Sequence, residues 1–129
     1  MALFNNGGSK SANSAASPEA KKFHASYGQL LVDGELIETG FTVFRDTFIF
    51  TNKRLIIVDV KGVSARQIDY VSVPYNRVMK FSVLAMGNFE LDAELKIWVG
   101  NDSLPIEKKF DASVNVYEVQ KLLARYVLK

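Results

Sequence analysis

The sequence of 129 residues contains no cysteine, a single histidine and a single tryptophan. Without cysteine the chain can form no disulfide, no thiolate nucleophile and no cysteine-based metal site, which fits a protein of a reducing compartment. Its longest unbroken aliphatic run, from Leu55 to Val58, is far shorter than the roughly 20 apolar residues of a membrane-spanning helix. The first 17 residues lack the leading positive charge and the apolar centre of a secretory signal. We therefore expect a soluble, cytoplasmic protein, with the membrane surface as the alternative location.

An excess of charge of either sign is also missing. The 16 Lys and Arg residues stand against 14 Asp and Glu residues, which gives a formal net charge of +2. Because nucleic-acid-binding domains usually carry a strong basic excess, we expect no nucleic acid among the partners. The sequence also lacks a nucleophile elbow, a P-loop, a dinucleotide fingerprint and a metalloprotease motif. These absences predict a protein that is not an enzyme and that uses no cofactor and no metal.

The first helical features follow an N-terminal segment rich in Asn, Gly and Ser. Residues 1–17 have the composition of a flexible tail, and we expect residues 18–129 to form one domain. Ser17 suits a helix N-cap, Pro18 the first helical position, and Glu19 the positive end of a helix dipole. Apolar residues then recur at helical spacing, which predicts an amphipathic helix over 18–31; they are Ala20, Phe23, Tyr27, Leu30 and Leu31.

The rest of the sequence has the pattern of seven short strands and a closing helix. Turn residues separate β-rich runs at 36–44, 47–51, 54–60, 65–73, 78–85, 89–99 and 104–110. The sixth run alternates most clearly, with apolar residues at odd positions and mainly charged residues at even positions. A wide apolar stripe predicts the closing helix, with Asp111 as its expected N-cap. We therefore expect a mainly β fold, namely a seven-stranded antiparallel β-sandwich or partly open barrel with a C-terminal helix and a short N-terminal helix.

Three segments make this fold prediction more specific. The segments FRDTFIFTNKRLIIVDVKG, YVSVPYNRVMKFSV and FELDAELKIWVG resemble, in this order and spacing, the signature of the bacterial pleckstrin-homology (PH) domains. The resemblance covers about residues 27–128. It implies a sandwich of two sheets capped by the last helix, and self-association into ring-shaped homo-oligomers. It implies no activity, because the family is largely without an assigned function.

The first candidate site is basic. Lys53 and Arg54 follow the second predicted strand and Arg45 precedes it, and eukaryotic PH domains hold inositol phosphates with basic residues around their first hairpin. Here the link before the second strand is too short to fold over a headgroup, and a polybasic membrane site usually needs about 4 to 8 cations. The alternative is structural: Lys53 lies in a hairpin turn, and Arg54 pairs with Asp46 or Asp59.

The second candidate site is acidic. Glu90, Asp92 and Glu94 alternate along the sixth strand and therefore share one face, where three carboxylates could gather a hard cation. Neighbours on one face of a strand lie roughly 6.5–7 Å apart, which is too far for tight coordination without further ligands. The alternative is a solvated face, or a face paired with basic residues of a neighbouring strand or subunit.

Two single residues complete the candidates. Trp98 shares the polar face of the sixth strand and suggests a contact surface; the alternative is that it lies beneath the N-terminal helix or a loop. His24 has no partner at a recognisable catalytic spacing, so we expect a surface or packing role. We predict a non-enzymatic, self-assembling interaction scaffold, with another protein or the membrane surface as further partners. Weak binding of an anionic lipid or ligand is the alternative function, and an active site between subunits has only the three carboxylates in its favour.

Overall fold

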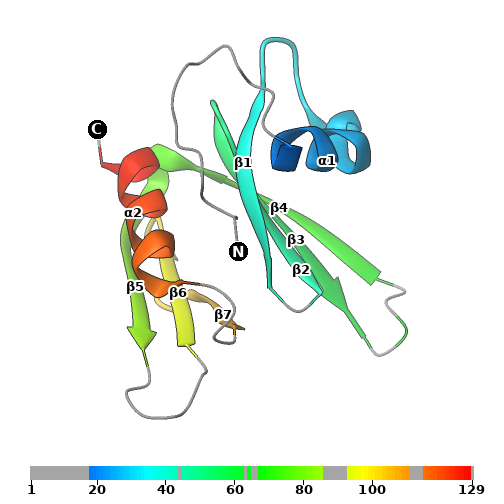
Figure 1. Ribbon diagram of the computed structural model, residues 1–129. Helices are drawn as coiled ribbons and strands as arrows, with labels where there is room; N and C mark the ends of the chain where they lie inside the picture. Colours follow the sequence, from blue (N-terminus) through cyan, green and yellow to red (C-terminus); the bar gives the residue numbers. More distant parts are fainter. Residues whose placement is uncertain are drawn as a thin grey trace. The chain divides into compact units, whose positions relative to one another are not determined.

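The computed structural model describes residues 18–43, 45–62, 64, 67–85, 93–110 and 115–128 of the chain (Figure 1). These residues belong to two compact parts, one ending at Ser72 and the other beginning at Val73. Seven strands lie in two sheets, one of four strands and one of three, so the predicted number of strands is confirmed. Within the described residues, no helix has the length and apolar character that a membrane crossing requires.

The first part consists of a short helix and the four-stranded sheet. Its elements are α1 (Pro18–Tyr27), the 3-10 turn η2 (Gly28–Leu30), β1 (Ile37–Val43), β2 (Asp46–Thr51), β3 (Arg54–Lys61) and β4 (Gln67–Pro74). The strands lie in the order β1-β2-β3-β4, which places β4 at an edge, where the missing N–H of Pro74 is tolerated. The helix predicted over 18–31 ends at Tyr27, because Gly28 weakens a helix at that point and the chain tightens into η2.

Both faces of this sheet carry buried residues, because successive side chains of a strand point to opposite faces. One face packs against α1: Ile49, Ile56 and Val58 form a cluster with Ala20 and Phe23 of the helix. On the opposite face of the strands, three rings stack, with centroids of Phe41 5.0 Å from Phe48 and 6.3 Å from Phe50. The aliphatic run from Leu55 to Val58 therefore contributes to two layers of core.

Gly40 of β1 allows the helix to approach the sheet closely. A Cβ atom at this position would lie 2.5 Å from the carbonyl oxygen of Phe48 and 3.0 Å from Cε2 of Phe23. The carbonyl oxygen belongs to the neighbouring strand and cannot move without disturbing the β1–β2 pairing. The packing therefore requires glycine at this position.

The second part contains the three-stranded sheet and the C-terminal helix. Its elements are the 3-10 turn η3 (Tyr75–Arg77), β5 (Val78–Ala85), β6 (Ala93–Val99), β7 (Ile106–Phe110) and α2 (Val116–Val127). The order is β5-β6-β7, with antiparallel pairing throughout. The predicted bounds of β5 are confirmed, and β7 begins later than predicted, after Pro105, which has no N–H to donate. Residues 89–92 of the predicted sixth strand lie outside the described residues.

The alternation predicted for β6 is confirmed over its described length. Ala93, Leu95 and Ile97 are buried, whereas Glu94, Lys96 and Trp98 are half-buried. Because residues paired across strands share a face, the polar face of β6 continues into β5 and β7. The sheet therefore has one buried face and one face of mixed charge.

The N-cap of α2 corrects the sequence prediction. The cap is Asn115, whose backbone is extended and whose side-chain oxygen accepts hydrogen bonds from Tyr117 N and Glu118 N, at 2.9 and 3.3 Å. Asp111, the predicted cap, comes too early in the chain and lies outside the described residues. Both residue types cap well, so composition alone could not choose between them; the helix begins where the apolar stripe of its buried face begins. That face is formed by Val119, Leu122 and Leu123.

Candidate functional site

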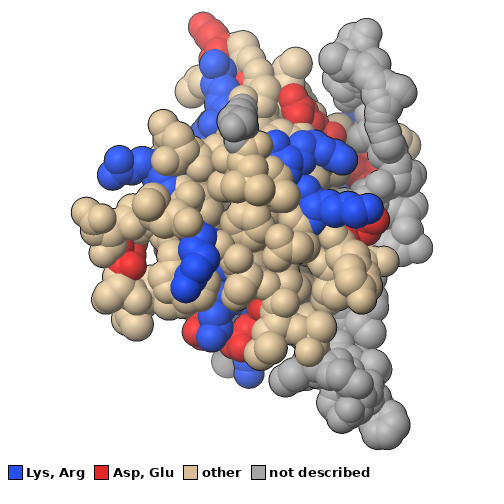
Figure 2. All heavy atoms as spheres, turned by 90° about the vertical axis from the view of Figure 1, so that its left-hand side faces the viewer, with Lys and Arg blue, Asp and Glu red and all other residues tan. Residues whose placement is uncertain are grey.

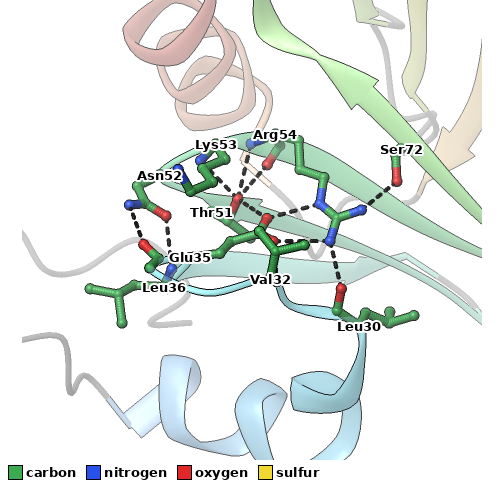
Figure 3. A network of polar contacts seen from close by, with 10 residues as sticks. Leu30, Val32, Glu35, Leu36, Thr51, Asn52, Lys53, Arg54 and Ser72 are labelled. Atoms are coloured by element: carbon green, nitrogen blue, oxygen red, sulfur yellow. Dashed lines mark hydrogen bonds and ion pairs between the residues drawn. The ribbon is translucent and has the colours of Figure 1, made fainter.

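The densest polar network in the described residues surrounds Arg54 at the start of β3 (Figure 3). Its guanidinium forms an ion pair with Glu35, donating from Nε to Oε2 at 2.8 Å and from Nη2 to Oε1 at 3.0 Å. It also donates from Nη2 to the carbonyl oxygen of Leu30 at 2.6 Å and from Nη1 to Ser72 Oγ at 2.8 Å. One side chain thus ties together η2, the loop before β1, and β4.

Glu35 is the buried partner of this pair, with a side chain that exposes 0% of its surface. Besides Arg54, its carboxylate accepts a hydrogen bond from Thr51 Oγ1 at 2.7 Å and one from Val32 N at 3.0 Å. The hydrogen bond from Arg54 is the largest influence on the pKa of Glu35, which falls to about 2 although burial acts in the opposite direction. The same bond raises the pKa of Arg54. Both groups are therefore charged at neutral pH, and their hydrogen-bonding capacity is used within the protein.

The turn between β2 and β3 is held by the residues on either side of it. Thr51 Oγ1 accepts hydrogen bonds from Lys53 N at 3.0 Å and from Arg54 N at 2.9 Å. Asn52 reaches across to the loop before β1: its Oδ1 accepts from Leu36 N at 2.8 Å and its Nδ2 donates to Gly34 O at 3.0 Å. The turn and the loop before β1 thus form one hydrogen-bonded tip.

The three basic candidates are not brought together as one site. Arg45 is exposed in the turn before β2, whereas Lys53 and Arg54 follow β2. The six residues of β2 lie between them, which is a separation of roughly 17–20 Å. Lys53 is exposed, and Arg54 is bound to Glu35, whereas the sequence suggested Asp46 or Asp59 as its partner. The Arg54 network therefore stabilises the fold of this part. The tip formed by the β2–β3 turn and the loop before β1 has few cations available to a ligand.

Of the acidic candidates, only Glu94 falls within the described residues. Glu90 and Asp92 lie outside them. Glu94 is half-buried on β6, directly opposite Lys109 of β7. The described residues contain no group of three or more His, Cys, Asp or Glu side chains placed to hold a metal ion. On the described part of this face, acidic and basic side chains therefore lie opposite each other on neighbouring strands.

Trp98 lies half-buried on the same face as Glu94, with the ammonium of Lys80 4.2 Å from the centre of its indole ring. The two residues are opposite each other in the β5–β6 pairing. His24 is exposed on α1, and its ring lies beside the backbone of Gly28. Of these two residues, only Trp98 has a cation against its ring, which makes its surroundings unusual for a side chain on a polar face.

On the side in view in Figure 2, acidic and uncharged side chains lie among those of Lys and Arg.

The fold and the sequence lead to one family. The chain matches the bacterial PH domain family over residues 7–127. It belongs to the bacterial PH domain family. The resemblance of the three segments is thereby confirmed. The match begins within the segment predicted to be a tail, so the domain boundary at residue 18 stays a prediction.

Individual relatives of this bacterial PH domain agree with the assignment. It is 42% identical to the uncharacterized protein YjqA of Bacillus subtilis strain 168 over 96 residues, which are 74% of this chain and 77% of that protein. A pleckstrin homology domain from Shewanella amazonensis SB2B superposes with a TM-score of 0.79 and 35% identity, covering 92% of this chain and 94% of the other. A DUF1696 family protein with a pleckstrin-homology domain from Shewanella loihica PV-4 superposes with a TM-score of 0.73 and 36% identity, covering 84% of this chain and 93% of the other. These relatives show the family and the PH-like fold.

Proposed function

We propose that this bacterial PH domain is a non-enzymatic, cytoplasmic interaction module that assembles with copies of itself into a closed ring. The ring is the form that the family resemblance implies. The observation that carries self-association is the outer half of β4, an edge strand of the first sheet. The four residues from Gln67 to Tyr70 are all exposed, on both faces of the strand.

An exposed sheet edge offers backbone N–H and C=O groups to a strand of another chain. The outer half of β4 also exposes apolar side chains, because Ile68 and Tyr70 lie on one face of the strand and are 43% and 47% exposed. The opposite edge strand, β1, exposes less surface than the outer half of β4, since four of its seven residues are buried. If β4 pairs with a different surface of the next copy, the contact is heterologous, and such contacts generate rings when the rotation closes.

A membrane-surface or anionic-ligand role is less well supported. It would rest on Arg45, Lys53 and Arg54, but the charge of Arg54 is balanced by buried Glu35, and Arg45 lies at the far end of β2. Exposed Asp33 in the neighbouring loop further reduces the positive charge near Lys53. Repeating a weak site around a ring could increase its avidity, but the site in each copy would hold few available cations.

The test is sedimentation velocity or light scattering on the full chain at micromolar concentration. We expect an assembly larger than a monomer for the natural sequence, and smaller species for the double variant Ile68→Lys/Tyr70→Lys, because lysine on an edge strand opposes pairing. Val32→Lys is the matched control, since Val32 is 57% exposed in the same part of the chain but outside β4. A strictly monomeric natural chain would rule out self-assembly, and an unchanged assembly in the double variant would rule out β4 as its contact.

A further inference from the structure

A second surface lies on the three-stranded sheet, around the indole of Trp98. The β5–β6 pairing shifts register between Val78 and Lys80, so Met79 is the extra residue of a β-bulge. Bulges change the direction in which nearby side chains point. The result here is two neighbouring exposed residues on β5: Met79 is 68% exposed, and the ammonium of Lys80 lies over the Trp98 ring.

The remaining charged side chains on this face of the three-stranded sheet lie opposite residues of opposite charge. Lys96 pairs with Glu107 of β7 at 3.8 Å, and Glu94 is opposite Lys109 in the register. Among the described residues, Lys80 has the indole as its contact and no carboxylate partner. An ammonium over an aromatic ring keeps donors that an incoming carboxylate can use.

A second cation lies near the end of β6. Arg77 O accepts a hydrogen bond from Gly100 N at 2.7 Å, and a Cβ atom at Gly100 would lie 3.9 Å from Arg77 Nη2. The guanidinium is thus beside the backbone two residues after Trp98. Asp102, which follows in the same turn, is exposed. Two cations, Lys80 over the indole and Arg77 beside Gly100, therefore lie near the end of the strand that carries Trp98.

We propose that Met79, Lys80 and Trp98 form a docking site for an acidic, partly apolar peptide segment of another protein. Lys80 would bind a carboxylate of the segment, and the exposed apolar surface of Met79 and the indole would take a neighbouring apolar side chain. Aromatic and methionine side chains are common anchors of this kind. An extended polyanion such as a membrane or a nucleic acid fits less well, because it needs several available cations, whereas Lys96 and Lys109 of this face lie opposite Glu107 and Glu94. This site goes beyond the proposed self-association, which uses β4.

Trp98 makes the site directly observable, because it is the only tryptophan of the chain and its fluorescence reports on this face alone. The probe is a short blocked peptide in which Glu and Leu alternate, added to the full chain at low salt. We expect a saturable change in the Trp98 emission, weakened by added salt. The same peptide with Gln in place of Glu should bind about fivefold more weakly or not at all, as expected for the loss of an exposed ion pair.

Three variants test which cation is responsible. Lys80→Gln should weaken binding of the Glu–Leu peptide by about fivefold, whereas Lys80→Arg should preserve it, because arginine keeps both the charge and the contact with the ring. Lys61→Gln, an exposed lysine paired with Asp59 in the first part, is the matched control and should bind as the natural chain does. Circular dichroism verifies that each variant is folded. The Trp98 emission of each variant with peptide is compared with the emission of the same variant without peptide.

Several results would overturn the proposal. These are an unchanged Trp98 emission up to millimolar peptide, equal binding of the Gln–Leu peptide, and undiminished binding by Lys80→Gln. Two further arms distinguish other sources of negative charge: inorganic phosphate, and vesicles of phosphatidylcholine with phosphatidylserine. If either changes the emission through Lys80 while the Glu–Leu peptide does not, the site binds an anion or a membrane and the peptide proposal is wrong. None of these results depends on whether β4 mediates assembly.

Discussion

Replacing Glu35 by glutamine is the sharpest test of the Arg54 network. The substitution keeps the shape of the side chain and removes the charge that faces Arg54. The pKa of Glu35 is about 2 in the folded chain, against an ordinary value of 4.5. At about 1.4 kcal/mol for each pH unit, this difference corresponds to a contribution of about 3 kcal/mol to the free energy of unfolding at neutral pH. Breaking a buried ion pair by removing one partner typically costs about 3–5 kcal/mol, which agrees in size.

The expected pH dependence follows from the direction of the pKa shift. Because the folded chain holds the Glu35 proton more weakly than the unfolded chain, the stabilisation is complete above about pH 5 and is lost as the pH falls from about 4.5 toward 2. The free energy of unfolding of Glu35→Gln should therefore be about 3 kcal/mol lower than that of the natural chain at pH 7. At pH 3 this deficit should be about 2 kcal/mol smaller.

Urea denaturation between pH 7 and pH 3, followed by far-ultraviolet circular dichroism, measures both quantities. Trp98 fluorescence gives a second probe located in the other part of the chain, and coincident transitions establish that a single free energy describes unfolding. Asp33→Asn is the matched control, since it removes an exposed carboxylate from the same loop and should change stability by less than about 0.5 kcal/mol. A deficit below about 1 kcal/mol at pH 7, or one that stays constant down to pH 3, would refute the reasoning.

Two further substitutions test the helices. Asn115→Ala should lower the free energy of unfolding by about 1 kcal/mol, because it removes the side-chain acceptor of Tyr117 N and Glu118 N, while Asn115→Asp should retain most of this stability. Equal losses in urea denaturation for both variants would contradict the capping role. Gly40→Ala should cost about 1–3 kcal/mol through overpacking between β2 and α1, and thermal unfolding should show a lower midpoint. An unchanged midpoint would contradict the close packing of position 40 against the Phe48 carbonyl oxygen.

The sequence predicted the strands well because their signals are local. Period-2 alternation in β6 and the turn residues around β5 depend on neighbours along the chain; β5 has the predicted bounds, and β6 alternates as predicted over its described residues. Helix ends were predicted less well. Gly28 ended α1 earlier than the apolar spacing suggested, and two good capping residues, Asp111 and Asn115, competed for the start of α2.

The candidate site depends on contacts between distant positions, which no spacing rule reveals. Glu35 lies 19 residues from Arg54, and its sequence surroundings resemble an ordinary loop. The sequence offered nearer acidic residues as partners, because it contains no information on which carboxylate is buried. The contact between Lys80 and Trp98 was missed for the same reason: it requires both the β5–β6 register and the bulge at Met79.

The close approach at Gly40 also bears on how related sequences can diverge. The Phe48 carbonyl and the Phe23 ring fill the space that a Cβ atom at position 40 would need. The residue at position 40 therefore limits the size of the residue at position 23. In relatives, a side chain at the position of Gly40 and a large ring at the position of Phe23 should rarely occur together. Where position 40 is not glycine, we expect a shifted β2 backbone at the position of Phe48, together with a smaller residue at position 23 or an N-terminal helix seated further from the sheet. This pair of positions therefore distinguishes the members that hold the helix as this protein does from those that place it elsewhere.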